Sequence, residues 1–291
     1  MNLILPLLLI FTALVPMKAT CDELFLETGA AAGRFIGLRD DYVDADLFYV
    51  MDPVCNWAPI FDAHVYYLEK DTWAGSFGVG VRYQDCDCDR VWGANLFYDF
   101  REYEFEECCS CVCEKTKHRY FNRVGIGLES LGPCVDYRAN IYLPVGKSRI
   151  LGDQCLIDNI SGRYQATFSK FEYQPTGFDV EAGFNLGSCH DFALYGAIGG
   201  YYFHHAKLKD MAGPMARFDL TWFEWLSLEG RYSYDQVNHS AFQGRIALTV
   251  PLSDFWNCCS EACDCVNLFI QPFQRNGLIF SDRKCCWKYN W

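Results

Sequence analysis

The sequence predicts an all-β fold, a transmembrane antiparallel β-barrel of about twelve strands. Three observations support this prediction. Apolar and polar side chains alternate along many segments, as they do on the two faces of a β-strand. These segments are about ten residues long, enough for a tilted strand to cross a bilayer. The connections between them are alternately short and long, as in bacterial membrane barrels.

The clearest strand is "RVWGANLFYDFRE", residues 90–102. Its apolar face is formed by Trp92, Ala94, Leu96, Tyr98 and Phe100. The opposite, largely polar face includes Asn95 and Asp99. In a membrane barrel the apolar face points to lipid and the polar face to the lumen.

The same alternation recurs along the rest of the chain. It is clear in residues 74–84, 120–131, 135–143, 177–187, 216–222, 226–233 and 241–250. It is weaker in residues 29–38, 44–51, 59–68 and 191–203. The predicted total is twelve strands, and an even number brings both ends of a single-chain barrel to the same side of the membrane.

A soluble β-sandwich would also alternate, with its apolar face inside. Opposite charges and many glycines on the polar face, and aromatic residues at the ends of the apolar face, favour the membrane barrel. The short connections, at 132–133, 188–190 and 223–225, are expected to be periplasmic. The longer ones, at 102–119, 144–176, 204–212 and 236–240, are expected outside. Whether residues 163–173 form a hairpin arm above the membrane or an additional strand stays open.

The predicted lumen-facing side chains are mostly charged. They are Asp62, His64, Arg82, Asn95, Asp99, Glu129, Arg138, Asp179, Glu181, Arg217, Asp219, Glu229, Arg231 and Arg245. Rings of opposite charge could select ions in a channel. The preferred interpretation is that they pair across a narrow barrel and close it. The C-terminal tail, residues 252–291, could also fill the lumen.

The chain ends complete the predicted domain organisation. Residues 1–20 resemble a signal peptide, because the apolar run 3–15 is too short for a spanning helix; cleavage is expected after Ala19 or Thr20. The barrel is predicted over residues 21–251, followed by a cysteine-rich tail, 252–291. A formal net charge of −12 argues against nucleic-acid binding, which requires clustered Lys and Arg.

Several stretches in this order resemble one family, the β-domain of inverse autotransporters (the intimin and invasin translocators). They are "FGVGVRYQDCDCDRVWGANLFYDFRE", "RVGIGLESLGPCVDYRANIYLPVG", "GFDVEAGFNLG" and "LSLEGRYSYDQVNHSAFQGRIALTVPL". "QRNGLIFSDRK", residues 274–284, is similar to the start of the linker that threads back through the pore in that family. The resemblance covers roughly residues 59–284 and implies a twelve-stranded barrel. The sequence departs from the family in that only seven residues follow Lys284, so no passenger is expected.

Cysteine abundance is also foreign to ordinary intimins and resembles the disulfide-linked envelopes of chlamydia-type bacteria. Seventeen cysteines in an exported chain predict disulfides in an oxidising compartment. The candidates lie outside the strand cores and are Cys86, Cys88, Cys108, Cys109, Cys111, Cys113, Cys258, Cys259, Cys263, Cys265, Cys285 and Cys286. Vicinal pairs are hard to join to themselves, which favours bonds between segments or between molecules. The segment "CCSCVC", 108–113, is expected outside; Cys86, Cys88 and the tail clusters are expected in the periplasm. The spacing of the cysteines in residues 108–113 suits a structural zinc site poorly.

No catalytic motif is evident. The loops expected outside contain His204, His205 and Asp210, and then His239 and Ser240. No recognisable motif in these loops surrounds a nucleophile. The sequence therefore predicts no enzyme, no cofactor and no metal.

The predicted function is that of an integral protein of the bacterial outer membrane, with a structural or surface role in a disulfide-cross-linked envelope. Its expected partners are the lipid bilayer, other cysteine-rich envelope proteins joined through disulfides, and host or envelope partners of the outer loops. A diffusion porin for small solutes is the first alternative, and a soluble secreted β-sandwich is the second.

Overall fold

A computed structural model describes residues 23–85, 90–109, 112–160, 164–189, 192–223, 225–252 and 271–290. The signal peptide predicted over residues 1–20 lies outside these ranges. The described barrel strands are β1 (Glu23–Gly33), β2 (Tyr42–Val50), β3 (Trp57–Leu68), β4 (Thr72–Asp85), β5 (Arg90–Cys109), β6 (Val112–Leu131), β7 (Val135–Val145), β10 (Thr176–Cys189), β11 (Phe192–His204), β12 (Met211–Trp222), β13 (Leu226–Asp235) and β14 (His239–Pro251). The remaining elements are β8 (Arg149–Ile160), β9 (Tyr164–Tyr173), β15 (Asp282–Asn290) and a 3₁₀ turn, η1 (Glu69–Asp71).

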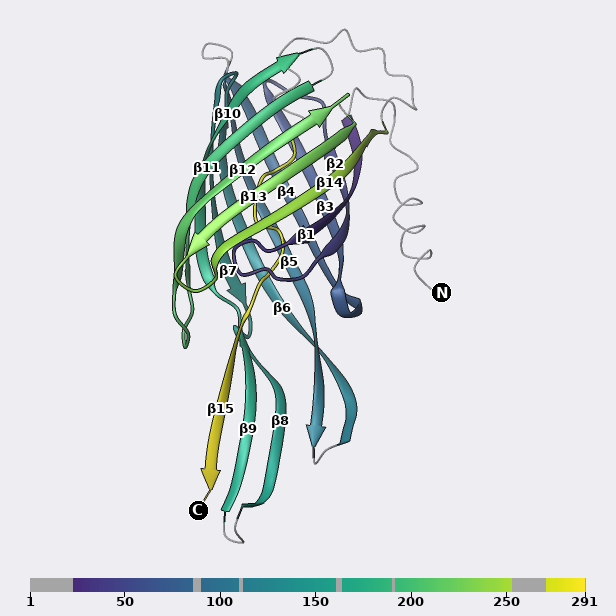
Figure 1. Ribbon diagram of the computed structural model, residues 1–291. Helices are drawn as coiled ribbons and strands as arrows, with labels where there is room; N and C mark the ends of the chain where they lie inside the picture. The colour runs from purple at the N-terminus through teal and green to yellow at the C-terminus, as the bar shows by residue number, and fades with distance from the viewer. Residues whose placement is uncertain are drawn as a thin grey trace.

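Twelve of the described strands form a closed antiparallel barrel, which confirms the predicted fold class (Figure 1). Each strand pairs with its neighbours in the sequence, except that β7 pairs with β10, and β1 pairs with β14 to close the ring. The register of this last pair places Ala30 opposite Ile246. A single closed sheet has no edge strands and is not the sandwich of two packed sheets considered as the second alternative.

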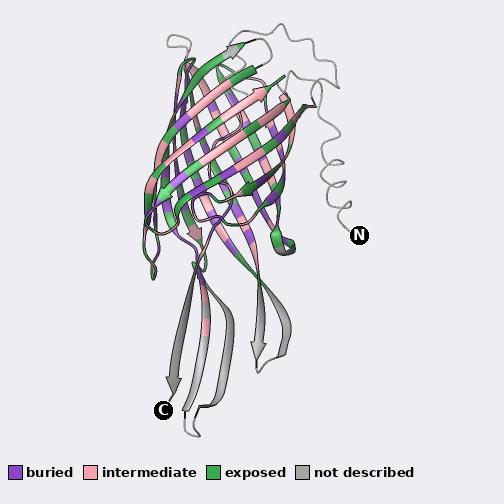
Figure 2. Cartoon of the chain, viewed as in Figure 1, coloured by how far each residue is buried: buried purple, intermediate pink, exposed green. Residues whose placement is uncertain are grey.

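The alternation of side chains decides which face is inside. On β5, Leu96 is 50% exposed and Tyr98 44%, whereas Asn95 is 9% exposed and Asp99 is completely buried. The same alternation of buried and exposed positions runs along the other barrel strands (Figure 2). In water so continuous an apolar surface would be a site of aggregation, but in lipid it is the expected outer face.

Aromatic side chains gather near both ends of the outer face. At the end with the short turns, the rings of Trp57 and Tyr83 lie 4.8 Å apart, and Trp222 stacks on Phe223 at 5.3 Å. At the other end of β3, Tyr67 packs on Trp73 at 4.9 Å. Such rings suit the two membrane interfaces, where an apolar body and a polar tip are both solvated.

Among the described residues, no helix combines the length and the apolar character needed to cross a bilayer.

The first strand differs from its prediction. The sequence pattern placed it at residues 29–38, but β1 ends at Gly33, where a φ of +106° turns the chain. The apolar residues that follow, including Ile36 and Leu38, do not face lipid; they fold inward and are buried. The apolar pattern therefore continued beyond the strand because these side chains pack inside the barrel.

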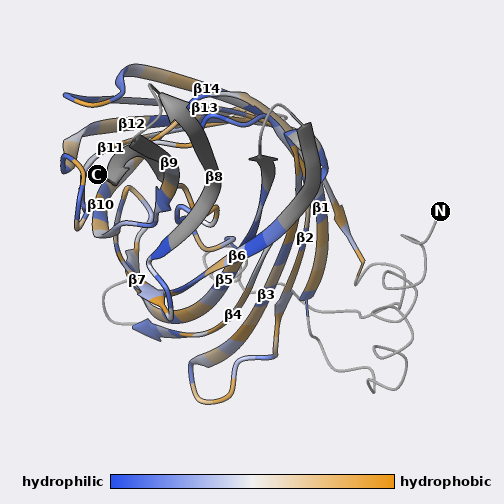
Figure 3. Cartoon of the chain, turned by 90° about the horizontal axis from the view of Figure 1, so that it is seen from below, coloured by the Kyte–Doolittle hydropathy of each residue, from blue (hydrophilic) through white to orange (hydrophobic). Residues whose placement is uncertain are grey.

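Long connections are structured at the end of the barrel opposite to the short turns. The described residues of the predicted connection 102–119 are an extension of β5 and β6 beyond their pairing with β4 and β7. The described part of residues 163–173 is β9, which belongs to an arm and not to the barrel wall, because it pairs with β8 and β15. We call this three-stranded sheet, β8–β9–β15, the outer sheet. Seen from this end, the strands of the barrel surround the lumen as a closed ring (Figure 3).

Candidate functional site

The lumen of the barrel contains part of the chain itself. Residues 271–281, here called the tail segment, pass between the barrel walls and continue into β15 (Figure 1). Phe273, Leu278, Ile279 and Phe280 are all buried, although none of them belongs to a strand. Each buried side chain of this size contributes about 1.5–3 kcal/mol. The apolar residues of the tail segment therefore hold it inside a lumen whose walls are largely polar.

Arg275 is the main charged anchor of the tail segment. Its Nη2 lies 2.6 Å from Asp99 Oδ2, and its Nη1 lies 2.8 Å from both Asp99 Oδ1 and Ser76 Oγ. Asp99 also accepts a hydrogen bond of 2.8 Å from Arg123 Nε. The guanidinium of Arg275 lies 4.1 Å above the ring of Phe97. A bidentate arginine–carboxylate pair of this kind fixes both position and orientation.

The backbone of the tail segment is satisfied by side chains of the barrel wall. Arg123 donates to the carbonyl oxygens of Asn276 and Gly277. Tyr142 Oη accepts from the backbone N–H of Asn276 at 2.8 Å, and Asn140 Nδ2 donates to the Gln274 carbonyl at 3.2 Å. This extended segment pairs with none of the described strands. The side-chain contacts therefore take the place of the backbone hydrogen bonds that a strand partner would supply.

Aromatic rings and glycines of the wall make room for Phe273. Its ring lies 6.0 Å from that of Phe48 and 5.8 Å from that of Phe97, both edge-on. A Cβ on Gly80 would lie only 2.4 Å from Phe273 Cζ. Glycine on the polar face thus provides space for an aromatic side chain at this position.

A second set of contacts holds the tail segment where it leaves the barrel. Arg101 Nη1 donates to the Ile279 carbonyl at 2.7 Å, and Tyr103 Oη donates to the same oxygen at 3.2 Å. The rings of Phe280 and Phe203 meet edge-on at 4.8 Å. Ser281 Oγ then donates to Glu172 of β9 at 3.0 Å.

The 34–41 connection closes the same end of the barrel. A Cβ on Gly37, whose φ is +78°, would lie 2.6 Å from Phe280 Cδ2. Glycine therefore allows this connection to approach the ring closely.

The predicted lumen-facing residues occupy inward positions of the barrel wall, and most of them pair with one another. Arg82 contacts Glu129 at 2.6 Å, and Arg217 contacts Glu181 at 2.7 Å. Further contacts are Arg138 with Glu181, Arg217 with Asp219, Arg231 with Glu229, Arg245 with Asp44 and Glu27, Asn140 with Asp179, and His64 with Asp62. Asn95 lies beside Gly127, where a Cβ would meet its side-chain oxygen at 2.4 Å.

A cavity remains beside the tail segment. Its volume is about 380 Å³, and it is bounded by the tail segment, by β1, β2 and β3, and by β12, β13 and β14. Glu27, Asp44, Asp46, His64 and Arg231 are among its lining residues. Space of this size admits water and small ions beside the tail segment.

Sequence reasoning missed several residues of the site, including Arg123, Tyr142, Asp44 and Asp46. Arg123 lies opposite Asp99 in the β5–β6 register, which a single sequence does not give. One signal was available at Phe97, which lies on the polar face of β5 and is buried. A large apolar side chain pointing into a lumen indicates that something apolar occupies that lumen.

The cysteines are only partly described. Cys86, Cys88, Cys111, Cys258, Cys259, Cys263 and Cys265 lie outside the described residues. Cys108 and Cys113 are register partners at the tip of the β5–β6 hairpin, next to Cys109.

The expectation that Cys285 and Cys286 lie in the periplasm, at the end of the short turns, is wrong. Both belong to β15 and pair with Lys170 and Ser169 of β9, in the outer sheet. The tail segment carries them through the barrel to the end opposite the short turns.

The loop residues considered for catalysis form a small polar cluster. His204 Nδ1 lies 2.8 Å from Asp210 Oδ1. Hydrogen bonds from the Tyr202 hydroxyl and the His205 backbone N–H lower the pKa of Asp210. His239 and Ser240 begin β14 and are exposed.

Comparison with known proteins defines the class of fold. No protein-family model matches the sequence, and no curated protein matches it. A solved structure from work on the in-meso crystallization of membrane proteins is 13% identical, covers 90% of this chain and 100% of its own, and has a TM-score of 0.57. An outer membrane channel from Pseudomonas putida F1 is 8% identical, covers 81% of this chain and 97% of its own, and has a TM-score of 0.52.

A weaker similarity, with a TM-score of 0.38 and 8% identity, is to the translocator domain of the autotransporter NalP from Neisseria meningitidis; it covers 85% of this chain and 94% of that one. At these identities the comparisons establish the fold alone.

The closed barrel with an apolar outer face is that of an outer-membrane β-barrel. The protein is therefore a protein of the bacterial outer membrane, with the lipid bilayer as its immediate partner.

Proposed function

We propose that the protein is an outer-membrane barrel of the inverse-autotransporter type that displays its own C-terminal segment at the cell surface. The observation that carries this proposal is the path of residues 271–290. They cross the lumen and end as β15, paired with β9 from Asp282↔Tyr173 to Asn290↔Gln165. The lumen segment of this sequence leads directly to a strand of the outer sheet.

The contacts of the tail segment support a stable arrangement. Arg275 and Asp99 are both buried, and separating a buried ion pair costs about 3–5 kcal/mol. The edge-on contact of Phe280 with Phe203 lies at the far end of the same segment. Anchors at both ends of the lumen favour a plug that also tethers β15, over a segment that slides freely.

We further propose a structural or surface role for the outer elements. The outer sheet and the β5–β6 hairpin are the surfaces offered to host or envelope partners. They carry Cys108, Cys109, Cys113, Cys285 and Cys286, which are candidates for disulfides with other envelope proteins. Enzymatic activity is not part of the proposed function.

Surface labelling of intact cells tests the proposed path. An epitope tag placed after the last residue should be accessible to antibody without permeabilisation. The matched control is the same tag inserted after Pro133, in the short turn between β6 and β7, which should be accessible only after the outer membrane is opened. Equal protection of both tags in intact cells would contradict the proposal.

Cross-linking is tested separately by gel electrophoresis without reductant. The expected result is a set of high-molecular-weight species that collapse to monomer when reductant is added. A monomer band without reductant would exclude the disulfide-linked envelope and leave the barrel topology unaffected.

A diffusion porin for small solutes is the alternative, and the cavity of about 380 Å³ beside the tail segment favours it. Single-channel conductance of the full chain in planar bilayers separates the two. Stable conductance steps would support the porin, whereas a closed baseline is expected for a plugged barrel.

A further inference from the structure

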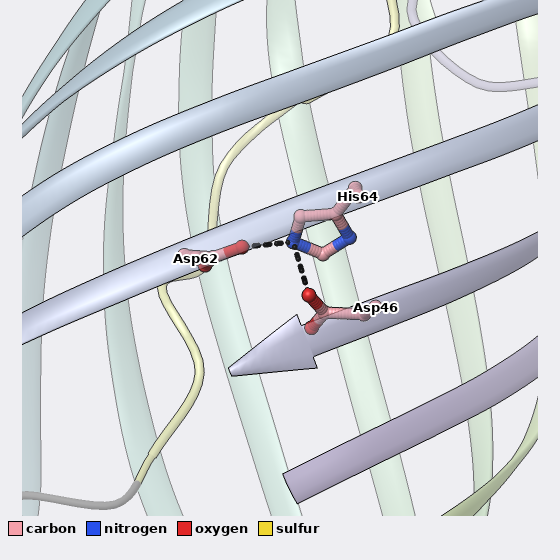
Figure 4. A group of neighbouring side chains, drawn as sticks. All are labelled: Asp46, Asp62 and His64. Atoms are coloured by element: carbon pink, nitrogen blue, oxygen red, sulfur yellow. Dashed lines mark ion pairs between the residues drawn. The ribbon is translucent and has the colours of Figure 1, made fainter. Parts of the chain in front are cut away.

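Three side chains on the inner face of β2 and β3 form a group that we call the Asp-His cluster: Asp46, Asp62 and His64 (Figure 4). Asp62 and His64 are two residues apart on β3 and therefore face the same side. Asp46 of β2 is the register partner of His64. The pleat and the strand register together thus bring one imidazole and two carboxylates to one point of the lumen wall.

The spacing of the cluster is that of a metal coordination shell. His64 Nε2 lies 2.8 Å from Asp62 Oδ1 and 3.3 Å from Asp46 Oδ1. One ligand atom from each residue lies within 4.8 Å of the others. Ligands about 2.1 Å from a tetrahedral ion lie about 3.4 Å from one another, so small side-chain adjustments would place an ion between them.

The carboxylates of the cluster have unfulfilled hydrogen-bonding capacity. Asp46 Oδ1 and both side-chain oxygens of Asp62 are buried, and apart from the ion pairs with His64 they have no hydrogen-bond partner among the described residues. The side chain of Asp62 has no exposed surface. Buried polar atoms are normally paired, and an unpaired carboxylate oxygen is among the most costly exceptions. These oxygens indicate a missing positive ligand at the cluster.

Charge balance sets this cluster apart from most other acidic groups of the lumen. Asp99, Glu129 and Glu181 each contact an arginine, and Asp44 contacts Arg245. The ion pairs described for Asp46 and Asp62 are to His64. Even with a protonated imidazole, two carboxylates leave one negative charge. A neutral imidazole with two carboxylates matches the charge of a divalent cation.

The cavity supplies a route and a further ligand. Asp46 and His64 both line the cavity of about 380 Å³, so an ion can reach the cluster from the lumen. Three protein ligands leave one position of a tetrahedral shell for water. Imidazole nitrogen selects Zn²⁺ and its first-row neighbours over Ca²⁺ and Mg²⁺, which prefer oxygen ligands alone.

We propose that His64 Nε2 and one carboxylate oxygen from each of Asp46 and Asp62 bind a divalent transition-metal ion of the zinc class, with water from the cavity as the fourth ligand.

Calorimetric titration of the full chain with Zn²⁺ tests this site. The protein is kept oxidised in detergent, its free thiols are alkylated so that cysteines do not compete, and it is stripped with a chelator. One saturable equivalent is expected. Asp62→Asn and His64→Gln should each weaken the affinity at least tenfold, roughly the smallest loss seen when a supporting residue of a metal site is removed.

The matched control is Glu229→Gln, which removes a carboxylate that lines the same cavity but pairs with Arg231. Its Zn²⁺ affinity should stay within about twofold of the parent. Absence of saturable binding, or equal affinity in the parent and both cluster variants, would overturn the proposal and leave an internal ion pair only. Ca²⁺ binding as tight as Zn²⁺ binding would also overturn it, since the imidazole would then not be a ligand.

Co²⁺ absorption of the parent protein provides a test that needs no variant, should a cluster variant fail to fold. The expected spectrum has the intense d–d bands of a four-coordinate nitrogen and oxygen site. A thiolate charge-transfer band, or the weak bands of the hydrated ion, would overturn the proposal.

Discussion

Replacement of Arg275 by methionine removes the charge that anchors the tail segment while keeping an apolar stem against Phe97. The variant loses the bidentate contacts to Asp99, of 2.6 and 2.8 Å, and the contact to Ser76. Breaking a buried ion pair by removing one partner costs about 3–5 kcal/mol. Because Arg123 still contacts Asp99 at 2.8 Å, the lower end of this range applies, about 3 kcal/mol.

The assay is denaturant unfolding of the refolded barrel, followed by the loss of its heat-modifiable gel mobility and by tryptophan fluorescence. A double-mutant cycle with Asp99→Asn isolates the pair. The coupling energy between the two substitutions should be about 2 kcal/mol, within the range found for residues that share a network. The control is Arg39→Met, which removes an exposed arginine and should change the free energy of unfolding by less than about 0.5 kcal/mol.

The reasoning is refuted if Arg275→Met is as stable as the parent, or if its effect and that of Asp99→Asn simply add. Either result would mean that Arg275 does not contact Asp99 in the folded barrel.

Three further predictions concern the packing of the lumen and the outer face. Gly80→Ala should force Phe273 to move and should destabilise the barrel by about 1–3 kcal/mol, whereas Gly244→Ala, whose Cβ would meet no atom within 4 Å, should be tolerated in the same unfolding assay. Leu96→Arg should cost about 2–4 kcal/mol if this residue lies near the bilayer midplane; an unchanged unfolding midpoint would argue against a lipid-facing position. Phe280→Ala should cost about 3–5 kcal/mol and should increase proteolysis of the C-terminal strand in folded protein; unaltered protection would show that this ring does not retain the tail segment.

The sequence was sufficient to predict which side chains face lipid and which face the lumen, because side chains alternate between the two faces of a pleated strand. Leu96 outside and Asp99 inside follow from their separation by an odd number of residues. The same reasoning failed at residues 34–38, where the apolar pattern continues but Gly33 ends the strand and Ile36 turns inward. Hydropathy alone does not distinguish a side chain facing lipid from one buried in a plug.

A single sequence does not predict which residues of neighbouring strands lie opposite each other. Asp46 and His64 meet because β2 and β3 pair in one particular register, and a shift of one residue would place them on opposite faces. The outer position of Cys285 likewise depends on the passage of the tail segment through the lumen. Resemblance to a pore-threading linker suggested this passage, and the contacts of Arg275 and Phe280 give it a physical basis.

Site-specific photo-cross-linking from position 273 tests most directly whether the tail segment lies inside the barrel. With a benzophenone amino acid in place of Phe273, irradiation of the folded protein in membranes should link this position to β2 near Phe48 or to β5 near Phe97. The two rings lie 6.0 and 5.8 Å from that of Phe273. Adducts formed only with lipid or with other proteins, and none with β2 or β5, would contradict the plugged lumen.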